Sequence, residues 1–150
     1  MKIFYFIATG FGLGKLPKAP GTWGTLGGVL LYLVLSSFSL FVYLSFVLLA
    51  FIGGCWLCEY VAKQMKVYDH ASVVWDEIVG YCVAMIGVPK QWGMMLAGFL
   101  LFRLFDILKP WPIRQIDTHM KSGVGMMLDD VLAGLFTCLI LFFVHALTTL

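Results

Sequence analysis

Residues 26–58 read LGGVLLYLVLSSFSLFVYLSFVLLAFIGGCWLC and contain no aspartate, glutamate, lysine or arginine. A helix needs about 20 apolar residues to cross a bilayer, so these 33 positions are too many for one upright helix. The polar break Ser36–Ser39 lies near the middle and favours a turn there. The stretch therefore predicts a helical hairpin, with one helix from about Thr22 to Leu35 and a second from about Leu40 to Val61.

A second apolar block, residues 78–102, is interrupted only by Lys90. The sequence Gly-Val-Pro-Lys at positions 87–90 predicts a turn, because proline ends a helix and glycine permits a tight backbone. We therefore expect a second hairpin, with helices from about Val74 to Val88 and from Trp92 to Leu108.

The last 20 residues, Val131–Leu150, are uncharged and predict one further span. Residues 1–8 are interpreted as a retained interfacial segment, because their apolar run is short for a signal peptide. Overall, 61% of the residues are hydrophobic and 12% are charged, whereas soluble domains carry about 25% charged residues. We expect one all-α membrane domain over residues 1–150, with about five short or tilted transmembrane helices and a charged site at the cytoplasmic face.

Basic residues divide unevenly between the two sides of such a domain. If both hairpins turn on the far side, nine lysines and arginines share one side and Lys90 stands alone on the other. Because basic residues favour the cytoplasm, the polar segments are expected there, with the C-terminus outside. The eight acidic residues fall at or near the same cytoplasmic ends. Ionisable groups so close to apolar sequence are usually paired, metal-bound or functional.

The segment KLPKAPGTWGTL, residues 15–26, is the first candidate site motif. Lys15 and Lys18 precede a Pro-Gly turn, and Thr22 is expected to cap the first long helix. Free N–H groups at a helix N-terminus suit an anion, so these residues are candidate phosphate contacts. The alternative interpretation is an ordinary helix start with lysines at the membrane interface.

Two acidic pairs open predicted helices. Asp76 and Glu77 begin the third helix, where acids are also favourable to the helix dipole alone. Asp129 and Asp130 begin the last helix, and two adjacent buried carboxylates repel each other unless a cation lies near them. Oxygen-only ligands suit magnesium or manganese better than zinc. Asp76, Asp129 and Asp130 are therefore the candidate metal ligands.

Arg103, Asp106 and Lys109 recur every three residues and so share one helical face. Such a row is either a structural ion-pair ladder or a phosphate clamp beside a metal ligand. Together with the acidic pairs, it describes a phosphoryl-transfer site at the depth of a lipid headgroup. The candidate catalytic residues are Asp76, Glu77, Asp106, Asp129 and Asp130, and the candidate phosphate-binding residues are Lys15, Lys18, Thr22, Arg103 and Lys109.

Four segments, in order, resemble the bacterial phosphatidylglycerophosphatase A family. They are KLPKAPGTWGTL (15–26), VWDEIVG (74–80), FRLFDILKPWPI (102–113) and GVGMMLDDVLAG (123–134). The resemblance covers about residues 9–137. It implies a magnesium-dependent, multi-pass phosphatase of the bacterial inner membrane that converts the lipid phosphatidylglycerophosphate to phosphatidylglycerol. The residues that it carries over are Lys15, Thr22, Asp76, Glu77, Arg103, Asp106, Lys109, Asp129 and Asp130.

Metal-assisted attack of water is the mechanism we expect. Asp76, Asp129 and Asp130 would hold one or two magnesium ions, and Glu77 or Asp106 would orient or deprotonate the water. A protein nucleophile is unsupported, because the sequence lacks a cysteine with an arginine six positions later, a D-x-D-x-T/V motif and a P-S-G-H motif.

Two rival functions remain open from the sequence. A small transporter or channel would suit apolar spans with buried charge, although the acids cluster at one face. A non-enzymatic assembly subunit would use the same charges as salt bridges. A nucleic-acid partner is not expected, because the formal charge is only +2 and no basic run would follow a phosphate backbone.

Overall fold

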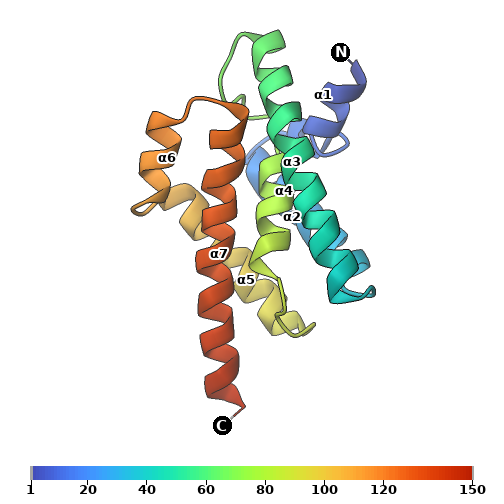
Figure 1. Cartoon of the computed structure of the whole chain (residues 1–150), viewed down its shortest axis with the longest axis vertical. Helices are drawn as coiled ribbons and strands as arrows, with labels where there is room; N and C mark the ends of the chain where they lie inside the picture. The colour runs from blue at the N-terminus through green and yellow to red at the C-terminus, as the bar shows by residue number, and fades with distance from the viewer. Residues whose placement is uncertain (1, 150) are drawn as a thin grey trace.

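The computed structural model describes residues 2–149, and this part of the chain is built from α-helices and one short 3₁₀ turn (Figure 1). The prediction of an all-α fold is therefore confirmed. The elements are α1 (Lys2–Ala8), the 3₁₀ turn η1 (Leu13–Lys15), α2 (Pro20–Leu35), α3 (Leu40–Met65), α4 (Trp75–Ala84), α5 (Trp92–Leu108), α6 (Ile113–His119) and α7 (Gly123–Thr148).

Local sequence explains where the long helices begin. Pro20 is the first residue of α2, where its fixed φ and missing N–H are tolerated. The hydroxyl of Ser39 accepts a hydrogen bond from the N–H of Val42 at 3.4 Å and caps α3. Ser122 caps α7 in the same way, accepting from the N–H of Gly125 at 3.2 Å. Serine and proline thus determine the first residues of these helices, which hydropathy alone does not locate precisely.

Two helices, α3 and α7, are long and apolar enough to cross a membrane, with 26 residues each. Only 28% of the most apolar window in each helix is buried inside the molecule. The core helix of a soluble protein would be mostly buried. Here large apolar side chains point outward instead, including Phe41, Leu49 and Phe143. Such a surface suits lipid rather than water as its surroundings.

Helix α4 is short and lies at the centre of the bundle, between α2, α3 and α7 (Figure 1). Its ten residues extend about 15 Å, half of a hydrocarbon core. The carbonyls freed where it ends are bound by side chains of neighbouring helices. The hydroxyl of Tyr43 donates to the carbonyl of Cys82 at 2.5 Å, and that of Tyr32 donates to Val88 at 3.3 Å. Buried carbonyls that have no acceptor role within a helix need such partners.

Replacing Tyr43 by phenylalanine is expected to destabilise the protein by about 1–2 kcal/mol, because the buried carbonyl of Cys82 loses its partner. Thermal unfolding in detergent measures this effect. Tyr60→Phe is the matched control, since the Tyr60 hydroxyl makes no hydrogen bond among residues 2–149. Equal unfolding temperatures for the two variants would contradict the proposed contribution of the Tyr43 hydroxyl.

The observed helices differ from the expected five in number and bounds. Helices α1 and α6 are additional, and each has seven residues, too few for a clear apolar period. Helix α7 begins at Gly123 rather than near Val131, so the acidic pair lies within the helix and is buried against its neighbours. Helix α4 ends at Ala84, four residues before the predicted end. Both predicted turns, at Ser36–Ser39 and at positions 87–90, lie between helices as expected.

Candidate active site

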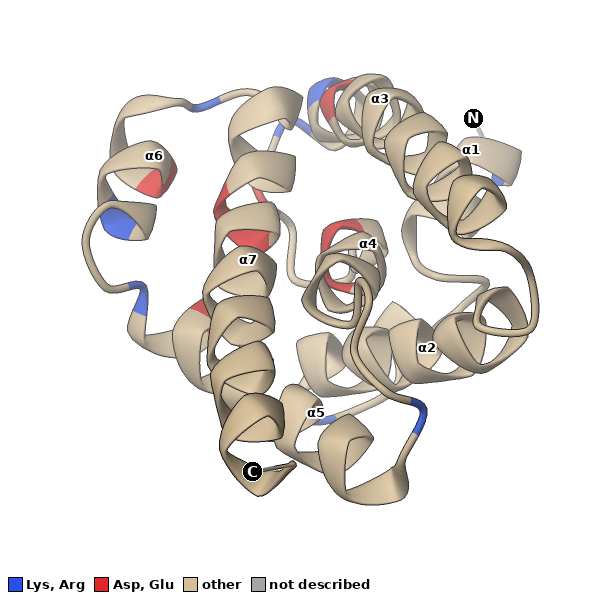
Figure 2. Ribbon diagram, turned by 60° about the horizontal axis from the view of Figure 1, so that its bottom comes forward, with Lys and Arg blue, Asp and Glu red and all other residues tan. Residues whose placement is uncertain are grey.

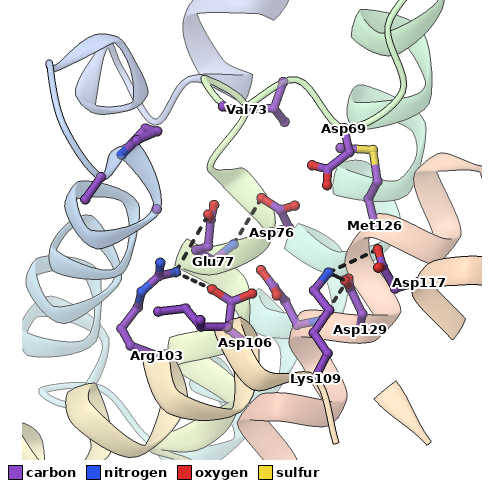
Figure 3. A pocket seen from close by; sticks show the side chains of 16 residues that line it. Asp69, Val73, Asp76, Glu77, Arg103, Asp106, Lys109, Asp117, Met126 and Asp129 are labelled. Atoms are coloured by element: carbon purple, nitrogen blue, oxygen red, sulfur yellow. Dashed lines mark hydrogen bonds and ion pairs between the residues drawn. The ribbon is translucent and has the colours of Figure 1, made fainter. Parts of the chain in front are cut away.

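A cavity of about 360 Å³ lies between the facing ends of α2, α4, α5 and α7, with α6 beside it (Figure 3). Seven of the eight acidic residues of the chain line it, together with only two basic residues. Figure 2 shows acidic positions on neighbouring turns of α4, α6 and α7. The charged residues that line the cavity are Asp69, Asp76, Glu77, Arg103, Asp106, Lys109, Asp117, Asp129 and Asp130.

Three carboxylates from α4 and α7 form the centre of this cavity. One oxygen each of Asp76, Glu77 and Asp130 lies within 4.8 Å of the other two. Asp76 and Asp130 are almost fully buried, at 6% and 4% exposure. Among residues 2–149, neither of them forms an ion pair with a basic side chain. Buried carboxylates this close together repel each other unless a cation joins them.

Arg103, on α5, lies at the edge of the acidic centre, beside Glu77. Its guanidinium Nη1 pairs with the Asp106 carboxylate and lies 4.0 Å from Glu77 Oε1 (Figure 3). The Arg103 Nε and the Glu77 Oε2 are buried without a hydrogen-bond partner in the described part of the chain. Buried polar atoms rarely stay unpaired in a finished protein. A donor and an acceptor are therefore available to a bound group.

Lys109 directly follows the last residue of α5 and bridges two acids from other helices. Its ammonium donates to Asp129 Oδ2 at 2.6 Å and lies 3.0 Å from Asp117 Oδ1. Burial by itself lowers the pKa of Lys109, but the hydrogen bonds to these two carboxylates outweigh it and hold that pKa above its usual value. The residue therefore remains a cation at the edge of the cavity. Its φ of 45° lies in the left-handed region.

The first turn of α2 approaches the site so closely that a side chain has no room. A Cβ built on Gly21 would lie 2.5 Å from Glu77 Oε1 and 2.7 Å from Arg103 Nη1. The Pro20–Gly21 backbone thus forms one wall of the cavity. The close approach explains the glycine of the Pro-Gly pattern, because the absence of a side chain at Gly21 lets α2 pack against Arg103 and Glu77.

The donor set fits a hard divalent cation. All the central ligand atoms are carboxylate oxygens, which magnesium prefers. Five more acidic than basic residues line the cavity, and one central oxygen is buried without a partner. A metal ion would satisfy that oxygen and reduce the repulsion among the three carboxylates. The residues available to hold one are Asp76, Glu77 and Asp130.

Comparison with known proteins identifies the family. The family model described as phosphatidylglycerophosphatase A matches residues 6–145, which include every residue that lines the cavity. The chain belongs to the phosphatidylglycerophosphatase A family. It is therefore an enzyme, a phosphoric monoester hydrolase.

Two curated relatives carry the name phosphatidylglycerophosphatase A. The protein of Haemophilus influenzae is 44% identical over 140 residues, which cover 92% of this chain and 86% of the relative. The protein of Escherichia coli is 38% identical over 142 residues, covering 94% of this chain and 83% of the relative. No solved structure matches the chain.

In this member of the phosphatidylglycerophosphatase A family, the structure brings together all five predicted catalytic residues, with Arg103 and Lys109. The predicted metal ligands are Asp76, Asp129 and Asp130, whereas the three acids that could hold an ion in the structure are Asp76, Glu77 and Asp130. Asp129 instead pairs with Lys109. The three remaining predicted phosphate contacts do not line the cavity. Their role in phosphate binding stays a prediction.

The positions of those three residues have local causes. Lys15 lies over the ring of Tyr5, 4.6 Å from its centroid. Helix α2 begins at Pro20, two residues before the expected cap, so Thr22 lies within its first turn. Lys18 is exposed beside the cavity wall, with a left-handed φ of 63°.

Two acids of the cavity were not among the predicted site residues. Asp117 belongs to the short helix α6, and Asp69 lies in the loop before α4. Loss of water around the Asp69 carboxylate raises its pKa, and the Lys109 ammonium opposes this shift. Both residues lie in polar segments, where an isolated acid looks like an ordinary solvated residue. Their closeness to Lys109 marks them as site residues, and it is visible only in the folded chain.

Proposed function

We propose that this chain removes the terminal phosphomonoester of phosphatidylglycerophosphate, giving phosphatidylglycerol and phosphate, by magnesium-assisted attack of water. The family and the names of both relatives support the substrate. The single observation that carries the mechanism is the acidic centre: three carboxylates within 4.8 Å, of which Asp76 and Asp130 are buried without a basic partner among the described residues. Oxygen ligands in this number suit magnesium.

The charge of the cavity supports the need for a cation. A phosphomonoester carries close to two negative charges at neutral pH. Seven acids and two bases would repel it, so the phosphate could not bind to the protein groups alone. The chemistry that magnesium supplies when bound is neutralisation of charge on the phosphoryl oxygens.

The side chains around this centre have separate roles in the proposal. Asp76, Glu77 and Asp130 hold the ion, and Asp129 adds negative charge beside them. Arg103 offers its unpaired Nε to a phosphate oxygen, while Asp106 fixes the guanidinium through Nη1. Arg103 contacts only one oxygen of Asp106, so the other oxygen is the acceptor we assign to the proton of the attacking water.

We also propose that the cavity faces the cytoplasm from the inner membrane of a bacterium. Figure 1 shows the C-terminus and both hairpin turns toward one end of the molecule, and the acidic ends of α4 and α7 lie toward the other. With both hairpin turns at the first end, nine of the ten lysines and arginines belong to the segments at the acidic end, and Lys90 alone belongs to a hairpin turn. The excess of lysine and arginine there supports a cytoplasmic orientation. A headgroup at this depth would reach the cavity while its acyl chains stay in the bilayer.

Phosphate release from phosphatidylglycerophosphate by purified protein in detergent tests the proposal. We expect release to require magnesium, to stop when EDTA removes it and to resume when magnesium is restored in excess. Phosphatidylglycerol should appear in equal amount to phosphate. Equal rates with and without EDTA would refute the metal-assisted mechanism. Folded protein that releases no phosphate at any magnesium concentration would refute the assigned reaction.

A further inference from the structure

A second cavity, of about 460 Å³, lies directly beside the acidic one, where α5 ends and α6 begins. Lys109 belongs to the lining of both cavities and so lies between them. The other residues that line the second cavity are Leu108, Pro110, Trp111, Arg114, Gln115 and Thr118.

The two cavities are opposite in charge. Seven acids line the first, whereas none lines the second, whose charged residues are Lys109 and Arg114. Arg114 is exposed and forms no ion pair with any acid among residues 2–149. The Gln115 side chain makes no hydrogen bond within the described residues, so its amide N–H groups are available to a ligand. Because Lys109 is already paired with Asp117 and Asp129, Arg114 is the cation through which the second cavity can bind an anion.

The rim of the second cavity is apolar and faces outward. Trp111 is 74% exposed and Leu108 is 65% exposed, and both lie next to the charged groups of the cavity. Tryptophan is typical of the headgroup level of a membrane, where its ring is partly in lipid and partly in water. A ligand with an anionic group and an attached apolar part would match this combination.

We propose that the second cavity binds the phosphodiester that links the headgroup of the substrate lipid to its diacylglycerol, with Arg114 as the contact of opposite charge. This inference rests on the proposed function. Phosphatidylglycerophosphate carries two phosphates, separated by one glycerol. With the terminal phosphate in the acidic cavity, the glycerol would pass Lys109 and the diester would reach Arg114. The acyl chains would then leave past Trp111 and Leu108 into the bilayer.

Recognition of the diester would separate this substrate from simpler lipid phosphates. Phosphatidic acid has a terminal phosphomonoester attached directly to diacylglycerol and has no second phosphate. It would occupy the acidic cavity alone and make no contact with Arg114. The second cavity would therefore be a specificity site, which lowers KM for the longer headgroup and leaves the chemical step unchanged.

Kinetics of Arg114→Gln in uncharged detergent micelles test the inference. KM for phosphatidylglycerophosphate is expected to rise about tenfold, the effect of losing one partly exposed charged contact with phosphate, while kcat stays within about twofold. Arg114→Lys keeps the charge and should recover most of the loss. Lys66→Gln removes an exposed cation that lines neither cavity and should leave KM unchanged. An unchanged KM in Arg114→Gln would overturn the inference.

A soluble phosphodiester tests whether Arg114 binds the phosphodiester of the substrate or is only attracted to the anionic surface of a membrane. Glycerophosphoglycerol, which has a phosphodiester and no phosphomonoester, should inhibit the wild type competitively and the Arg114→Gln variant about tenfold more weakly. If the Arg114 effect appears only on vesicles rich in phosphatidylglycerol, and Lys66→Gln shares it, the cavity is not a specific site. If the wild type releases no phosphate, the proposed function fails, and binding of glycerophosphoglycerol measured by calorimetry still decides the role of Arg114.

Discussion

Asp130→Asn is expected to lower kcat for phosphate release by at least about a thousandfold, while the protein still folds and inserts. Asp130 supplies one of three carboxylate oxygens within 4.8 Å, and it forms no ion pair within residues 2–149. An amide keeps the shape but removes the negative charge that holds the cation. Several kcal/mol of charge stabilisation in the transition state then disappear, and each 1.36 kcal/mol corresponds to about a tenfold change in rate.

The stability of the same variant separates loss of the metal site from misfolding. Without magnesium, Asp130→Asn should unfold at the same temperature as the wild type or higher, because it removes repulsion among buried carboxylates. With magnesium, the wild type should gain stability and the variant should gain little. Glu59→Gln is the matched control: Glu59 accepts from the N–H of Gly123 at 2.6 Å and does not line the cavity. Full activity in Asp130→Asn would remove this residue from the mechanism.

Gly21→Ala is expected to reduce kcat about a hundredfold without a comparable loss of stability. The new methyl group would lie 2.5 Å from Glu77 Oε1 and 2.7 Å from Arg103 Nη1, so both side chains must move. Misplacement of catalytic groups by about 1 Å costs on the order of a hundredfold in rate. The backbone should adapt readily, because Gly21 lies in the first turn of a helix, where alanine is favourable.

The control for this prediction is another helical glycine with free space around it. A Cβ on Gly53, in α3, would meet no atom within 4 Å. Gly53→Ala should therefore leave activity unchanged and raise stability by about 0.5–1 kcal/mol. Phosphate release and thermal unfolding, measured for both variants in the same detergent, compare the two sites. Similar activities in Gly21→Ala and Gly53→Ala would show that the cavity wall tolerates a side chain.

The sequence alone determined the class of the fold and the type of chemistry. Apolar runs, and the breaks at Ser36–Ser39 and positions 87–90, located both hairpin turns, because helix ends depend on nearby serine, glycine and proline. The motifs also supplied the five catalytic candidates, since acids beside long apolar segments are rare unless they have a partner or a function. These features are local in the chain and can be read without knowing which helices pack together.

The tertiary structure alone decided which charges meet. Asp76 and Asp130 are 54 positions apart in the sequence, and they come together because α4, which carries Asp76 in its first turn, packs along α7. The same packing assigns Lys109 to Asp117 and Asp129 and keeps Lys15 outside the cavity, over Tyr5. Sequence motifs identify the ionisable side chains, but which of them pair with each other depends on the relative positions of the helices. Coulomb energy depends on distance and burial, which only the folded chain fixes.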